Sequence, residues 1–198
     1  TAGSDRSFSI TSSQLADNSY TLTVKATDAL GNESAVSAGL EIEIDTTAPS
    51  TPSITTTTSL TNDNTPVIEG TAEAGSTVEL FNGSTSLGTA TAGSDGVFSI
   101  TSSQLADNSY TLTVKATDAA GNASAASAGL TIEIDTTAPS PPTITTTTAL
   151  TKDTTPLIVG EADANNFVTL FVNGENTGDS VLSNGNGNFA LSPSSSLN

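Results

Sequence analysis

The feature that most constrains this chain is a long internal repeat. The sequence that begins at Thr1, TAGSDRSFSITSSQLADNSYTLTVKATDA, returns at Thr91 with only small changes, 90 residues later. The same spacing continues, because TPSITTTTSLTNDNTPVIEG from Thr51 is matched by PPTITTTTALTKDTTPLIVG from Pro141. A period of this length is typical of a whole small domain copied in tandem, not of one turn of a solenoid.

The repeat boundaries divide the chain into three parts. We expect the C-terminal half of one domain in residues 1–44, a complete domain in residues 45–134, and the N-terminal part of a third domain in residues 135–198. The chain therefore begins and ends within a copy, as expected for a segment of a longer array. Duplication of a whole domain lengthens the protein, which favours a structural role over a catalytic one.

Period-two alternation predicts β-strands throughout the complete domain. It is clearest where Tyr110, Leu112 and Val114 share one face while threonines and a lysine occupy the other. Strands are expected at residues 53–58, 67–71, 77–81, 85–91, 97–101, 110–116 and 130–134. Asn82-Gly83 is the favoured dipeptide of a tight hairpin turn. Seven short strands without helical periodicity predict an all-β Greek-key β-sandwich.

The two tyrosines of the chain occupy one repeated position. Tyr20 and Tyr110 each follow the sequence LADNS, so both lie just after a tight turn, at the start of a strand. This placement is typical of a tyrosine corner, in which the phenol hydroxyl bonds to nearby backbone. We therefore expect a structural role for both tyrosines.

Three motifs resemble bacterial immunoglobulin-like repeats. They are IDTTAP at the repeat boundary, EGTAEAGSTV after the second strand and ATDAAGN near the end of the domain. Such tandem repeats build the stalks of giant secreted adhesins, including RTX adhesins exported by type I secretion. The resemblance implies immunoglobulin-like sandwiches arranged end to end, at the bacterial cell surface or secreted.

Composition excludes several classes of function. The chain has no His and no Cys, so disulfides, thiolate metal sites and nucleophile–base catalysis are not expected, and we predict that it is not an enzyme. With 21 acidic and 4 basic residues, its net charge of −17 repels nucleic acid. No apolar run approaches the roughly 18 residues of a membrane span, so no membrane insertion is expected. No signal peptide is visible.

The carboxylates are expected to gather at the two poles of the sandwich, because neighbouring strands alternate in direction. The pole where the chain enters, here called the N-terminal pole, receives loop and linker residues Asp45, Glu73, Asp95, Asp118 and Asn122. The opposite, C-terminal pole receives Asp63, Asp107 and Asp135. In the third copy Asp163 replaces Glu73, whereas Asn186 replaces Asp95, which argues against Asp95 as an essential ligand. The acidic pair Glu41 and Glu43 is interpreted as a solvated strand face.

These positions predict structural calcium at the inter-repeat junctions. Calcium takes six to eight oxygen ligands from carboxylates, amides, backbone and water, and converging carboxylates without a cation repel one another. The predicted ligands are Asp45, Glu73, Asp118, Asn122, Asp63, Asp107, Asp135 and Asp163. The alternative is that Asp and Asn are present because they favour polar turns.

The sequence thus predicts a non-catalytic spacer in an adhesin stalk, stiffened by calcium, whose partners are the neighbouring repeats of the same chain. One alternative is an extracellular filament or biofilm-matrix protein, in which identical chains associate because incomplete sandwiches leave unpaired edges. A carbohydrate- or protein-binding module is disfavoured, because Trp is absent and both tyrosines occupy corners.

Overall fold

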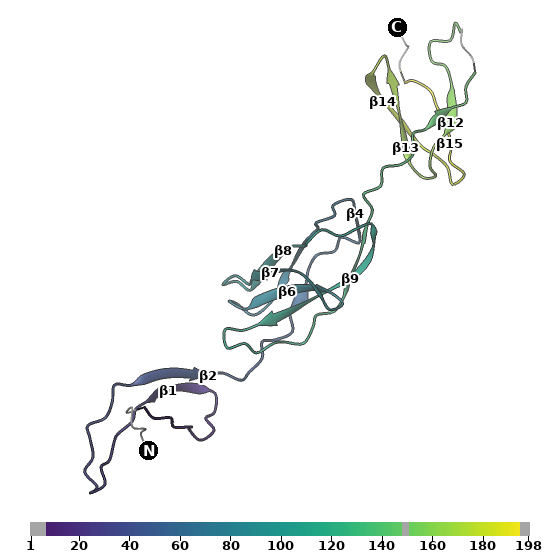
Figure 1. The fold of residues 1–198 in the computed structure, drawn as a ribbon. Coiled ribbons are helices and arrows are strands. Elements are labelled where there is room, and N and C mark those ends of the chain that lie inside the picture. Colours follow the sequence, from purple (N-terminus) through teal and green to yellow (C-terminus); the bar gives the residue numbers. More distant parts are fainter. Residues whose placement is uncertain (1–6, 148–150, 195–198) are drawn as a thin grey trace. The chain divides into compact units, whose positions relative to one another are not determined.

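The structure is a computed structural model that describes residues 7–147 and 151–194. It divides into two compact units, Thr1–Thr136 and Thr137–Asn198, each considered by itself below. Every regular element in the described residues is a β-strand, which confirms the predicted all-β class (Figure 1). No helix in this part of the chain is long and apolar enough to cross a membrane.

The complete repeat forms two facing sheets within the first unit. Its strands are β3 (Ser53–Ile54), β4 (Leu60–Thr61), β5 (Val67–Thr71), β6 (Thr77–Asn82), β7 (Thr85–Thr91), β8 (Val97–Thr101), β9 (Asn108–Thr117) and β10 (Leu130–Ile134). The larger sheet has the order β4-β10-β9-β6-β7, and the smaller has the order β3-β5-β8. All pairs are antiparallel except β4 with β10.

The predicted strand bounds are confirmed for β5, β7, β8 and β10, and β6 and β9 run slightly longer. The prediction for residues 53–58 is wrong beyond Ile54. There the backbone N–H groups of Thr55 and Thr56 both donate to the Glu69 carbonyl, which interrupts regular pairing. The chain then forms the unpredicted strand β4, which pairs in parallel with the end of β10, so this repeat has eight strands instead of seven.

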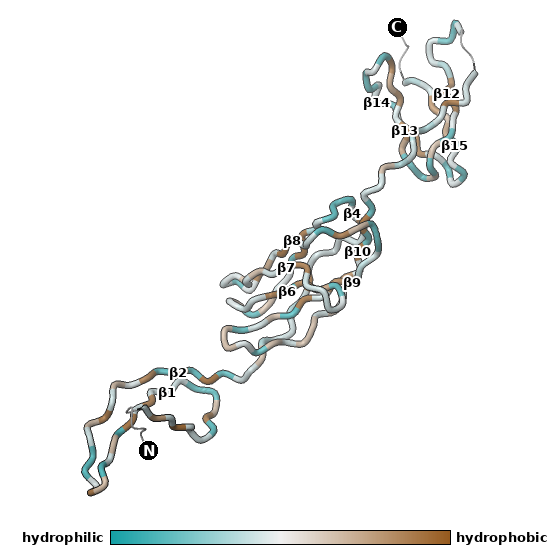
Figure 2. Tube along the Cα trace, viewed as in Figure 1, coloured by the Kyte–Doolittle hydropathy of each residue, from teal (hydrophilic) through white to brown (hydrophobic). Residues whose placement is uncertain are grey.

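The core lies between the two sheets and comes from alternate residues of their strands. Phe98 and Ile100 of β8 are each 2% exposed, whereas their neighbours along the strand face solvent. Figure 2 shows the matching apolar positions along β6 and β9. Gly70 of β5 has no side chain because a Cβ there would collide with the Phe98 ring and the Ser53 carbonyl oxygen.

Both tyrosine corners are confirmed. The Tyr110 hydroxyl donates to the Ala106 carbonyl oxygen at 3.0 Å, and the Tyr20 hydroxyl donates to the Ala16 carbonyl oxygen at the same distance. Each bond spans four residues and fixes the turn before the next strand.

From Ser7 onward, the N-terminal half-repeat contains two strands, β1 (Asn18–Leu22) and β2 (Leu40–Ile44), paired antiparallel. Residues 7–11, which correspond in sequence to β8, form no strand. In the complete repeat β8 is held by β5, and the described residues before β1 pair with no strand of this kind. A β-strand needs a neighbouring strand to bond its backbone N–H and C=O groups, so an alternating sequence pattern does not by itself form a strand here.

Among its described residues, the second unit contains five strands. They are β11 (Thr143–Ile144), β12 (Ile158–Glu161), β13 (Phe167–Val172), β14 (Glu175–Leu182) and β15 (Asn188–Leu191). They form a β11-β12-β15 sheet and a β13-β14 hairpin. Strand β14 has 8 residues where its counterpart β7 has 7, and the register of the β13-β14 hairpin shifts between Thr169 and Phe171.

Candidate functional site

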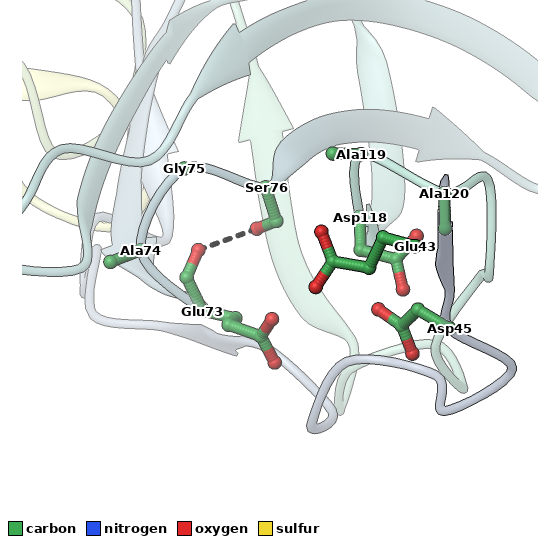
Figure 3. A pocket seen from close by; sticks show the side chains of 9 residues that line it. All are labelled: Glu43, Asp45, Glu73, Ala74, Gly75, Ser76, Asp118, Ala119 and Ala120. Carbon is green, nitrogen blue, oxygen red and sulfur yellow. Dashed lines mark hydrogen bonds between the residues drawn. The ribbon is translucent and has the colours of Figure 1, made fainter. Parts of the chain in front are cut away.

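A cleft of about 430 Å³ lies where the linker enters the complete repeat. Its walls are acidic side chains and small residues, namely Glu43, Asp45, Glu73, Ala74, Gly75, Ser76, Asp118, Ala119 and Ala120 (Figure 3). Two carboxylates come from the first copy and its linker, and two come from the second copy. The predicted residues Asp45, Glu73 and Asp118 are therefore brought together at the N-terminal pole.

Each carboxylate reaches the cleft from the end of a strand. Glu43 lies in β2, two residues before Asp45, and Asp118 directly follows β9. Glu73 lies in the turn between β5 and β6, where the Ser76 hydroxyl donates to its carbonyl oxygen at 2.7 Å. Figure 3 shows the carboxylates of Glu43, Asp45 and Asp118 facing the same space.

Asn122 connects the loop after β9 to the linker. Its side-chain amide donates to Asp118 Oδ2 at 2.9 Å and to the backbone carbonyl oxygen of Asp45 at 3.0 Å. Its backbone N–H donates to Asp118 Oδ1 at 2.9 Å. The side-chain bond from Asn122 is the main reason why the pKa of Asp118 lies below its usual value, against a smaller opposing effect of desolvation. Asp118 is therefore an anion that is already oriented.

The donor chemistry of the cleft suits a hard cation, because every side-chain donor is an oxygen. The arrangement itself is more open than a formed metal site. Within residues 7–147 and 151–194, no three acidic side chains are close enough together to hold one ion. Asp45 Oδ1 also accepts a bond from the Thr47 backbone N–H at 2.9 Å. To bind one ion together, these carboxylates would need to move closer to one another.

The predicted residues at the C-terminal pole lie away from this cleft and make local contacts. Asp63 Oδ1 accepts bonds from the backbone N–H and the hydroxyl of Thr65, at 2.8 and 3.0 Å, as in an Asx turn. The backbone N–H of Asp135 donates to the Thr61 carbonyl oxygen at 3.0 Å. The structure places these two residues at the end of β4 and β10.

Asp107 binds the linker that leaves its own domain. Its Oδ1 accepts bonds from the Thr136 backbone N–H at 3.0 Å and from the Thr136 hydroxyl at 2.7 Å. The same contact occurs one repeat earlier, where the carboxylate of Asp17 accepts bonds from the hydroxyls of Thr46 and Thr47 at 2.8 and 2.9 Å. Bonds from Thr46, chiefly from its side chain, lower the pKa of Asp17.

Sequence reasoning missed Asp17 and the linker threonines. The available signal was the pair of threonines that follows both boundary aspartates, in the repeated sequence IDTTAP. Glu43 was also missed as a cleft residue, because alternation within β2 indicated only a solvated face.

Asp163 contacts the linker that precedes its own domain in the second unit. Its Oδ2 accepts a bond from the Ser140 backbone N–H at 2.7 Å, and its carbonyl oxygen accepts one from the Ser183 hydroxyl at 2.6 Å. Asp95, the position set aside on sequence grounds, accepts a local bond from the Val97 backbone N–H at 3.0 Å. Carboxylates at these junctions thus bind linker backbone and hydroxyl groups directly.

Comparisons with known proteins agree with this architecture. The sequence profile described as "Bacterial Ig-like domain" matches residues 1–46 and 48–136. Chitinase A1 of Niallia circulans is 39% identical over 129 residues, which cover 60% of this chain and 18% of that protein. Exoglucanase B of Cellulomonas fimi is 37% identical over 146 residues, which cover 64% of this chain and 13% of that protein.

The chain thus spans less than a fifth of these relatives. Among solved structures, "Biofilm associated protein - BSP domain" covers 75% of this chain and 25% of its own, at 23% identity and a TM-score of 0.30.

Proposed function

The chain belongs to the bacterial Ig-like domain family, and from this premise we propose that it is a non-catalytic spacer in an extracellular bacterial protein. The near-identity of successive copies supports a role in setting the length of the protein, because binding domains that diverge for recognition would differ more between copies. The absence of His and Cys leaves no usual nucleophile–base pair. The short share of the chitinase and the exoglucanase that resembles this chain fits a domain that accompanies others in a larger protein.

The placement we favour is the stalk of a cell-surface adhesin, in which tandem sandwiches hold a distal domain away from the cell. In that setting the useful property is the stiffness of the linkers. Asp17 and Asp107 already tie linker threonines to the preceding domain. Asn122 ties the linker carbonyl of Asp45 to the following domain. Such contacts restrict the hinge from both sides.

Calcium is the proposed stiffening ion, and one observation carries this proposal. Carboxylates from two successive repeats, Glu43 and Asp45 from one and Glu73 and Asp118 from the other, line a single cleft at the linker. An ion held there would link two domains that are otherwise joined by one covalent strand. It would also offset the repulsion between these anions.

Thermal unfolding of the chain with calcium and with chelator tests this proposal. Extracellular modules bind calcium with a Kd of about 10⁻⁴–10⁻³ M. For a Kd of about 10⁻⁴ M, an ion at about 10 mM that binds only the folded state adds about 2.7 kcal/mol. For a domain of this size, that raises the Tm by about 10–20 °C. An unchanged Tm would remove calcium from the proposal and leave the spacer role standing.

A matched pair of variants locates the ion. Asp118→Asn removes one cleft carboxylate, and we expect it to abolish most of the calcium-dependent shift. Asp28 is its counterpart in the half-repeat and binds Asn32 in the same way, at 2.9 and 2.8 Å. It does not line the cleft. Asp28→Asn should therefore leave the calcium response unchanged, and an equal effect of both variants would contradict the assignment.

A further inference from the structure

A threonine-rich segment of the complete repeat is only partly used by the fold. Residues 46–66, TTAPSTPSITTTTSLTNDNTP, consist mostly of Ser, Thr and Pro, and residues 136–156 repeat this composition as TTAPSPPTITTTTALTKDTTP. The run of threonines at residues 55–58 lies within the first of these segments. Thr favours β-strands, but strand β3 ends at Ile54. Pairing in a strand therefore does not account for the threonine run.

Thr56 is the member of the run that has a structural role. Its hydroxyl accepts a bond from the Glu69 backbone N–H at 2.7 Å and donates to the Glu69 carbonyl oxygen at 3.5 Å. The backbone N–H groups of Thr55 and Thr56 donate to the same carbonyl oxygen, at 2.9 and 3.3 Å. Two residues of this segment thus oppose one residue of β5, as in a β-bulge, and the Thr56 side chain holds that bulge in place.

The other three threonines of the run present free hydroxyl groups to solvent. Thr55, Thr57 and Thr58 are exposed, and within residues 7–147 and 151–194 their hydroxyls have no hydrogen-bond partner. The neighbouring hydroxyl of Ser53, by contrast, is bonded to the hydroxyl of Thr71 at 2.8 Å. The fold therefore leaves the three hydroxyls available for chemistry.

These hydroxyls lie where the chain crosses between the two sheets. Residues 55–59 connect β3, the end strand of the smaller sheet, to β4, the end strand of the larger sheet. A groove of about 280 Å³, lined by Ile54 and Leu130 among others, lies beside this crossing. No described strand pairs with the outer edge of β3. This side of the sandwich is therefore accessible to an enzyme and has room for an added group.

We propose that Thr55, Thr57 and Thr58 are O-glycosylation sites. Segments rich in Ser, Thr and Pro are typical of O-glycosylated stalks. The donor is a nucleotide-diphosphate hexose, and a glycosyltransferase catalyses the transfer. The threonine oxygen forms a bond to the anomeric carbon, the bond from that carbon to the diphosphate breaks, and the nucleoside diphosphate leaves with the electron pair. The hydroxyl proton passes to a base of the transferase.

A neutral sugar suits this chain better than a phosphate. Each phosphate would add about 1.5–2 negative charges to a chain whose net charge is already −17. A hexose adds bulk and hydroxyl groups without charge. Beside the unpaired edge of β3, it also hinders pairing with a strand of another molecule. The inference depends neither on calcium nor on the spacer role.

Mass spectrometry of the chain purified from the bacterium that produces it tests the proposal. Cleavage after Glu43 and Glu69 releases residues 44–69 as one peptide that contains the whole threonine run. We expect this peptide to exceed the mass of its sequence by one or more whole hexose residues. Fragmentation by electron transfer, which leaves sugars attached, should assign them to the three free threonines and none to Thr56.

The matched internal control is a pair of exposed threonines that lie within strands. Thr111 of β9 and Thr131 of β10 are opposite each other and exposed. Cleavage after Glu79 and Glu133 releases both in the peptide of residues 80–133. Because their backbone is held in a paired ladder, it cannot adapt to the acceptor site of a transferase. We therefore expect at least tenfold less modification of this pair.

Two variants separate modification from folding. Thr55→Val/Thr57→Val/Thr58→Val keeps β-branched side chains and removes the three free hydroxyls, so we expect the added mass to disappear with little change in Tm. Thr56→Val removes the side-chain bonds to Glu69, so we expect a lower Tm and sugars on the same three threonines.

An unmodified peptide of residues 44–69 would overturn the proposal. Sugars on Thr56, or equal modification of Thr111 and Thr131, would overturn the selection of sites by free hydroxyls outside a strand. A phosphate in place of a sugar would overturn the chemical class of the modification.

Discussion

Equivalent positions of two repeats hold a valine that is buried in one repeat and partly exposed in the other. Val114 of β9 is fully buried in the complete repeat, and Val24 is 37% exposed in the half-repeat. Val→Ala removes two carbon atoms at either site. For Val114 the lost transfer free energy is about 1.6 kcal/mol, at about 0.8 kcal/mol for each buried carbon. The residual cavity adds to this, for a total of about 2–3 kcal/mol.

For a domain of this size, a loss of 1 kcal/mol lowers the Tm by about 4–8 °C. We therefore expect Val114→Ala to lower the Tm of the complete repeat by about 10–20 °C. Val24→Ala changes an exposed side chain in another part of the unit, and we expect a loss below about 1 kcal/mol. Val24→Ala makes the same chemical change outside the complete repeat, so it controls for effects of the substitution that do not come from the core around Val114.

The assay uses the tyrosine corners. In a Tyr20→Phe background Tyr110 is the only tyrosine, and its fluorescence reports the complete repeat. Equal shifts for the two valine variants, or a shift below about 5 °C for Val114→Ala, would refute the assignment of Val114 to the core.

Three further predictions concern a glycine, a hydroxyl and a carboxylate. Gly70→Ala should cost about 1–3 kcal/mol in urea unfolding, because its Cβ would overlap a backbone carbonyl and an aromatic ring; unchanged stability would show that β5 can shift. Tyr110→Phe should cost about 1 kcal/mol through loss of the 3.0 Å bond to the Ala106 carbonyl, with calorimetry as the measurement. The hydrogen bond from the Thr46 side chain is the main reason why the pKa of Asp17 is lowered in the folded protein. The stabilisation from this linker contact is therefore fully present above the ordinary carboxyl pKa near 3.8. It is lost as the pH falls through the lower pKa of the folded state. An NMR titration of the Asp17 carboxyl carbon with a midpoint at or above the ordinary value would contradict this.

Several elements could be read from local sequence because their causes are local. Strands β8 and β10 each begin directly after a glycine, Gly96 and Gly129, and β10 ends just before Asp135. Tyr110 could be assigned to a corner for the same reason, since its bond spans only four residues. The alternation also identified which side chains of β9 face the core.

The candidate site was only partly accessible from sequence. Loop positions alone brought Asp45, Glu73 and Asp118 to one pole, and the structure places all three along one cleft. The contribution of Glu43 could not be found in this way, because it depends on how the end of β2 approaches the next domain. The hydrogen bond from Thr46 to Asp17 could not be predicted either, because the two residues lie 29 positions apart in the sequence.

The sequence by itself determined the all-β class, the repeat length and the inward face of β9. Tertiary structure alone decided which of those segments became strands. Residues 8–10 and 98–100 read FSI in both copies, yet only the second forms a strand, because only there does β5 supply the hydrogen-bond partners. Likewise β1 ends at Leu22 while β9 continues to Thr117 beside β6. Alternation is a property of one segment, whereas a sheet satisfies its backbone groups only through a second segment distant in the chain.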